Sequence, residues 1–156
     1  MREFKRVMRD IALLVARIVA GVTLVAHGWH RWQETGLDVQ VALVEATGLP
    51  NAAALVVATV AFELIGGVLL VFGLATPLVG LGMAVLNVAI IVTTKADGAF
   101  YAHLGGWEYN AIQAALGLMF LVYGSGRAGL DNLFVRPKDE HDSLIAESPQ
   151  AQTSHS

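Results

Sequence analysis

The residues best suited to chemistry in this sequence are ionisable and amide side chains that lie within or beside long apolar stretches. Insertion of a charged side chain at the centre of a membrane helix costs roughly 2.5–3.5 kcal/mol, so such residues usually face other helices and find partners there. We therefore treat these side chains as the candidate functional residues. They are Arg17, His27, Glu63, Asn87, Glu108 and Asn110.

Glu63 is the deepest of these groups, because it lies midway along the apolar stretch 52–74. Arg17 is its natural counter-ion, although antiparallel helices would make the two side chains lean in opposite directions. The alternatives are that Arg17 extends to the headgroups and that Glu63 is protonated or bonded to Asn87 or His27. A buried pair that only holds helices in register is the purely structural interpretation.

A second polar cluster is predicted where the first apolar stretch ends and the last one begins. His27 ends the first stretch, and Glu108, Tyr109 and Asn110 begin the last. Glu108 would sit in the first turn of its helix, where the helix dipole favours an anion. A quinone or a lipid headgroup would suit such a shallow pocket, and no metal site is predicted.

Composition excludes several classes of function. The chain has no cysteine, which removes disulfides, thiolate nucleophiles and cysteine-ligated metals. The net charge of −3 gives no basic field for nucleic acid. Walker loops, dinucleotide-binding glycine motifs and zinc-protease motifs are absent from the sequence.

Four apolar stretches are long enough, or nearly so, to cross a bilayer, which takes about 20 residues. The second and third are apolar all round, whereas helices of a soluble bundle keep a polar face. We therefore predict an all-α integral membrane four-helix bundle. Its expected spans are about 11–29, 52–74, 78–94 and 109–124.

The distribution of Lys and Arg predicts the orientation. Seven of these residues fall at the two termini, and only Arg31 and Lys95 fall in the connections on the opposite side. Both termini are therefore expected in the cytoplasm, with the chain in the cytoplasmic membrane. A cleaved signal peptide is the rival interpretation of the first stretch, and Arg17 inside it argues against cleavage. Residues 1–133 are expected to form the membrane domain and 134–156 a disordered tail.

Several motifs of this sequence resemble those of the DoxX family of membrane proteins. The positions that carry the resemblance are Gly28, Gly66, Gly67, Gly124, Gly126, Arg127 and Asp131. They belong to three motifs: Ala26-His27-Gly28, Glu63-Leu64-Ile65-Gly66-Gly67, and Gly124-Ser125-Gly126-Arg127, which is followed by Asp131. A fourth motif, Gly48-Leu49-Pro50, lies between the first two. Pro77, Lys95 and Ala128-Gly129 depart from the family pattern, so roles tied to those side chains do not carry over.

The resemblance implies a redox-linked accessory or quinone-associated membrane subunit that anchors or serves a partner oxidoreductase. An accessory subunit is favoured over a self-sufficient enzyme, because the chain cannot perform thiol chemistry itself. The alternatives are a non-catalytic scaffold or chaperone and a small-molecule transporter. The expected partners are the lipid bilayer and either an oxidoreductase or a second copy of the chain.

Overall fold

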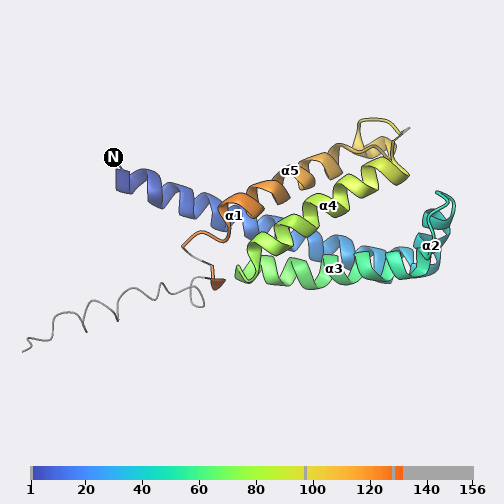
Figure 1. Ribbon diagram of the computed structural model, residues 1–156, viewed down its shortest axis with the longest axis horizontal. Coiled ribbons are helices and arrows are strands. Elements are labelled where there is room, and N and C mark those ends of the chain that lie inside the picture. Colours follow the sequence, from blue (N-terminus) through green and yellow to red (C-terminus); the bar gives the residue numbers. More distant parts are fainter. Residues whose placement is uncertain (1, 97, 128, 132–156) are drawn as a thin grey trace, which may run out of the picture.

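The computed structural model describes residues 2–96, 98–127 and 129–131, and within them it is all-helical with no strand (Figure 1). The predicted tail 134–156 lies outside these residues. The elements are α1 (Arg2–Trp29), the π-helical turn η1 (His30–Thr35), α2 (Leu37–Glu45), α3 (Ala52–Phe72), α4 (Thr76–Thr94), the 3-10 turn η2 (Ala102–Leu104) and α5 (Glu108–Tyr123). Four of the helices, α1, α3, α4 and α5, cover the four predicted apolar stretches, although α1 begins at Arg2, well before residue 11.

The long helices form two closely packed pairs, α1 with α3 and α4 with α5. A tight turn joins α3 to α4, but the two helices diverge as they leave it (Figure 1). We call the end of the bundle that holds this turn the turn end, and the opposite end the α2 end. Because α3 packs mainly on α1 and α4 mainly on α5, the short α3–α4 turn links the two pairs but the two helices share only a small interface.

Glycines allow the backbones within each pair to approach closely. A Cβ at Gly21 of α1 would lie 2.6 Å from the carbonyl oxygen of Gly67 on α3. A Cβ at Gly80 of α4 would lie 2.6 Å from the carbonyl oxygen of Gly117 on α5. Small residues serve this purpose in membrane bundles, where lipid supplies no hydrophobic drive for helices to associate.

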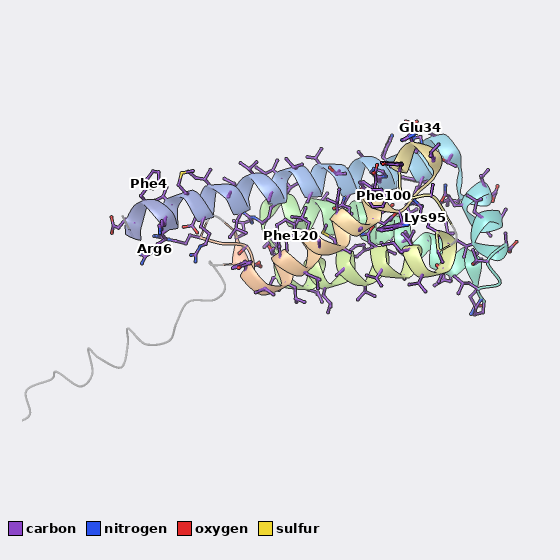
Figure 2. All side chains as sticks on the ribbon, turned by 90° about the horizontal axis from the view of Figure 1, so that it is seen from above. Phe4, Arg6, Glu34, Lys95, Phe100 and Phe120 are labelled. Carbon is purple, nitrogen blue, oxygen red and sulfur yellow. The ribbon has the colours of Figure 1, made fainter. Side chains whose placement is uncertain are left out.

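Apolar side chains fill the space between the two pairs, and Figure 2 shows Phe120 among them. The buried cluster consists of Ala20, Leu24, Leu70, Val79, Met83 and Phe120. Three described helical segments are long and apolar enough to cross a membrane: Glu3–Thr35, Ala52–Phe72 and Thr76–Thr94. The 16 residues of α5 would span only about 24 Å. A fourth crossing therefore stays a prediction.

The predicted motif residue Asp131 closes the turn end of the bundle. Its carboxylate accepts hydrogen bonds from the backbone N–H groups of Ala75, at 2.6 Å, and Thr76, at 3.0 Å. Its own N–H donates to the carbonyl oxygen of Gly73 at 3.0 Å. Asp131 thus caps α4 from outside the helix and fastens the end of the described chain to the α3–α4 turn.

Replacing Asp131 by alanine is expected to lower the free energy of unfolding by about 0.5–2 kcal/mol, the range for losing a helix N-cap. Unfolding in detergent micelles measures the change. Asp131→Asn keeps one acceptor oxygen and should fall between the wild type and Asp131→Ala. The control is Asp38→Ala, since Asp38 is exposed and makes no capping bond. Equal effects of the two alanine variants would contradict the capping role.

Candidate functional site

Glu63, the deepest carboxylate, pairs with Arg31, which was predicted to lie in a connection between two apolar stretches. Arg31 Nε lies 3.2 Å from Glu63 Oε2, and the Glu63 side chain is only 7% exposed. Arg31 belongs to η1, which continues directly from α1. The signal that could have found this pair is the basic residue that follows the His27-Gly28 motif at a short distance.

The predicted pairing of Arg17 with Glu63 is wrong. Arg17 is fully buried at the turn end, where a Cβ on Gly73 would overlap its guanidinium and the charge of Asp131 acts on it. Gly73 follows Glu63 by ten residues, which is about 15 Å along α3. Among the described residues the charged partner of Glu63 is Arg31, and the alternative bonds from Glu63 to Asn87 or His27 do not form.

Gly28 explains how Glu63 comes to lie against α1. A Cβ at Gly28 would lie 3.0 Å from the Glu63 Cβ and 3.0 Å from the Leu64 Cγ. The glycine therefore gives the Glu63 side chain room beside the α1 backbone. Two residues later the chain widens into the π-helical η1, a local distortion that often accompanies functional sites. The two sequence motifs that contain Gly28 and Glu63 thus meet in space.

Arg31 also reaches α2. Its Nη1 donates to Gln40 Oε1 at 3.1 Å. Arg31 therefore connects three elements: η1, which carries it, α3 through Glu63, and α2 through Gln40. Its side chain is 28% exposed, so the pair with Glu63 is sheltered but not sealed.

His27 and Tyr109 come together, as the predicted second cluster required. Their rings stack with centroids 4.5 Å apart and an interplanar angle of 19°. Gln113 donates from Nε2 to the Tyr109 hydroxyl at 2.7 Å. The charges of Glu63 and Arg31 both act on Tyr109, which places the two polar clusters within electrostatic reach of each other.

The remaining predicted candidates have other partners. Asn110 donates from Nδ2 to Asn87 Oδ1 at 2.9 Å, which joins α5 to α4 with both side chains buried. Asn87 in turn donates to the carbonyl oxygen of Met83 at 2.9 Å. Glu108 accepts from the backbone N–H of Ala102 at 2.9 Å. Asn87 and Asn110 therefore hold two helices together, and Glu108 shapes a loop.

Lys95 also lies at the α2 end, although it was not among the predicted site residues. Its Nζ donates to the carbonyl oxygen of Gly106 at 2.9 Å. Burial, with the nearby Arg31 charge, lowers the pKa of Lys95 from its ordinary value. Figure 2 shows Lys95 at this end of the bundle together with Glu34 and Phe100. Within the described residues, no group of three or more His, Asp or Glu side chains is arranged to hold a metal.

The apolar helices and the charges sheltered between them define an all-helical membrane protein. The chain belongs to the DoxX family, whose model matches residues 12–96, the stretch that carries both Arg31 and Glu63. It is also similar to the putative oxidoreductase CatD of Bacillus subtilis (strain 168), with 32% identity over 129 residues, covering 83% of this chain and 91% of that protein. No solved structure matches the chain. The resemblance predicted from the motifs is therefore confirmed.

Proposed function

We propose that this chain is a redox-linked accessory subunit of the membrane that serves a partner oxidoreductase. The observation that carries the proposal is the sheltered Arg31–Glu63 pair, because ionisable side chains within membrane segments are rare and mark functional sites such as proton relays. Family membership and the name of the Bacillus subtilis relative support a redox setting. The absence of cysteine favours an accessory role over self-contained thiol chemistry.

A connected set of titratable groups suits such a role. Arg31 contacts Glu63, both charges act on Tyr109, and Tyr109 stacks on His27. Reduction of a quinone takes up protons as well as electrons, so a site that serves it needs groups able to pass protons. We propose a quinone as the ligand with which this set works.

The test measures electron transfer to quinone in membranes that hold the full chain and its co-purified partner. Glu63→Gln keeps the size and removes the proton exchange, so we expect at least about a tenfold loss, less than the roughly 10²–10⁴ of direct acid–base catalysis. The matched control is Glu34→Gln, since Glu34 is exposed and pairs with His30 at the surface. Full activity in Glu63→Gln membranes would contradict the proposal.

A scaffold role has one specific observation in its favour. The N-terminal turns of α1 extend past the α3–α4 turn, and Figures 1 and 2 show this overhang. Phe4 is 69% exposed and Val7 is 53% exposed there. A variant with Phe4→Ser and Val7→Ser should lose co-purifying proteins if the scaffold role holds. Unchanged recovery of the partner would leave the overhang without a part in binding.

We further propose that the chain crosses the cytoplasmic membrane four times, with α5 as the last span and both termini in the cytoplasm. The Lys and Arg distribution supports this orientation. Because the chain has no native cysteine, single introduced cysteines report accessibility cleanly. Phe4→Cys and Pro77→Cys should react with a membrane-impermeant thiol reagent only from the cytoplasmic side, and His103→Cys only from outside. Phe4→Cys and Pro77→Cys reacting from opposite sides would contradict this threading.

A further inference from the structure

A cavity of about 260 Å³ opens between α3 and α4 near the α2 end. The two helices diverge toward that end, as Figure 1 shows. We call it the wedge cavity. Val56 and Val60 line it from α3, Leu86 and Ile90 from α4, and Gln40 and Val44 from α2. Arg31 lines it as well, and so the cavity adjoins the Arg31–Glu63 pair.

We propose that the wedge cavity binds the head of a long-chain membrane amphiphile, a head that is uncharged and carries hydrogen-bond acceptor oxygens. This class of ligand follows from three features of the cavity, namely its apolar walls, its neutralised cation and its size. The inference stands apart from the proposed redox role, because it concerns what enters this cavity and not what is done with it.

The walls favour a ligand that arrives from the bilayer. The α3 and α4 residues that line the cavity are mostly aliphatic, and its strongest polar groups are Arg31 and Gln40. The hydroxyls of Thr93 and Thr94, which also line it, donate to carbonyl oxygens of their own helix. An apolar pocket with a few convergent polar groups is the usual form of a small-molecule site.

The charges at the polar side favour an uncharged head with acceptor oxygens. The Glu63 carboxylate already offsets the Arg31 charge at 3.2 Å, so an anionic head would meet a competing carboxylate. A cationic head would be repelled by Arg31 itself. Gln40 accepts from Arg31 through Oε1, which leaves the two N–H donors of its amide nitrogen for another acceptor. Ether, ester, hydroxyl and ring-carbonyl oxygens all meet this requirement.

The size limits what the cavity holds. Its volume of about 260 Å³ is a little below the roughly 300–1,000 Å³ of pockets that enclose a drug-sized ligand. A single ring or a glycerol unit fits this space, whereas a whole lipid does not. The chain of the amphiphile would therefore remain among the acyl chains outside.

Binding of radiolabelled probes to the purified full chain in micelles tests the inference. The neutral probes are a benzoquinone with a decyl tail and dioctanoylglycerol, and the charged probe is dioctanoylphosphatidylglycerol. We expect at least one neutral probe to bind at least tenfold more tightly than the charged probe. Tighter binding of the charged probe, or binding of no probe, would overturn the inference.

Two variants place the binding in the wedge cavity. Ala89 lines the cavity, so Ala89→Phe should fill it and weaken neutral-probe binding at least tenfold. Gln40→Leu removes the amide donors without touching the α3–α4 contact and should weaken neutral-probe binding several-fold. This variant provides the test if Ala89→Phe does not fold. The control is Ala115→Phe on the exposed face of α5, which should bind as the wild type does. Unchanged binding in Gln40→Leu and in a folded Ala89→Phe would overturn the assignment.

The two neutral probes separate this inference from the proposed function. If the benzoquinone binds, the cavity and the redox role share a ligand. If only the glycerolipid binds, the cavity assignment holds and the quinone must be sought elsewhere. Failure of both neutral probes overturns the cavity assignment alone, since the Glu63→Gln electron-transfer test judges the redox role independently.

Discussion

Replacing Gly117 by valine is expected to force α5 away from α4 and to lower the free energy of unfolding by about 3 kcal/mol, the upper end for overpacking. A Cβ at Gly117 would lie 2.6 Å from the carbonyl oxygen of Gly80 and 2.8 Å from the backbone nitrogen of Ala84. Neither atom can yield without a shift of the whole helix. The same distortion should break the Asn87–Asn110 hydrogen bond between these helices.

The control for this change lies two residues away on the same helix. Ala115 is exposed on the outer face of α5, so Ala115→Val should change the free energy of unfolding by less than about 0.5 kcal/mol. Unfolding of both variants in detergent micelles makes the comparison. If Gly117→Val unfolded with the stability of Ala115→Val, the close approach of α4 and α5 would be refuted.

Replacing Glu63 by alanine is expected to cost about 3 kcal/mol in the same measurement. Removing one member of a buried ion pair typically costs 3–5 kcal/mol, because the other charge is left without compensation. The partial exposure of Arg31, 28% of its side chain, places the expected loss at the lower end. A small cavity beside Gly28 would add to it, since that glycine packs on the Glu63 side chain.

Glu63→Gln separates the charge from the shape. The amide keeps the volume and an acceptor oxygen for Arg31, so its cost should be clearly smaller than that of alanine. The double variant Arg31→Met with Glu63→Leu should recover much of the stability, because apolar replacements of a buried pair are often neutral. If the Glu63→Ala protein were as stable as the wild type, the carboxylate would make no contribution to the stability of the fold.

The apolar stretches predicted the helices well, because period and length are local properties of a chain. The three segments long enough to span a membrane fall where the stretches 11–29, 52–74 and 78–94 predict them. The motif ending at Asp131 was identified in the sequence, but the capping role of Asp131 was not predicted. Capping the α3–α4 turn depends on a contact across more than 50 residues, which spacing alone cannot give.

The partner of Glu63 was mispredicted for a geometric reason. Depth was counted from the ends of the apolar stretches, which placed Arg17 inside the membrane and Arg31 outside it. In the structure α1 starts far beyond the turn end, as Figure 1 shows, so Arg17 lies level with Gly73. The α1–η1 helix also continues to Thr35, which brings Arg31 level with Glu63. The offset between two packed helices is set by side-chain fit along their whole length.

The wedge cavity could not have been predicted from the sequence. It exists because α3 packs on α1 and α4 packs on α5, so that the two consecutive helices diverge. The predicted four-helix bundle did not specify which helices pack in pairs. His27, Glu108 and Asn110 were predicted to lie near one another, and all three lie at the α2 end of the bundle. Pairing within the structure then gave Asn110 and Glu108 partners of their own.

A pair of double-mutant cycles tests most directly which arginine Glu63 needs. Glu63→Gln is combined once with Arg31→Gln and once with Arg17→Gln, and unfolding in micelles gives each coupling energy. Contacting residues couple by about 0.5–3 kcal/mol, whereas sites more than 7–10 Å apart add within about 0.5 kcal/mol. We predict a coupling of about 1 kcal/mol or more with Arg31 and none with Arg17. Coupling with Arg17 and additivity with Arg31 would contradict the site described above.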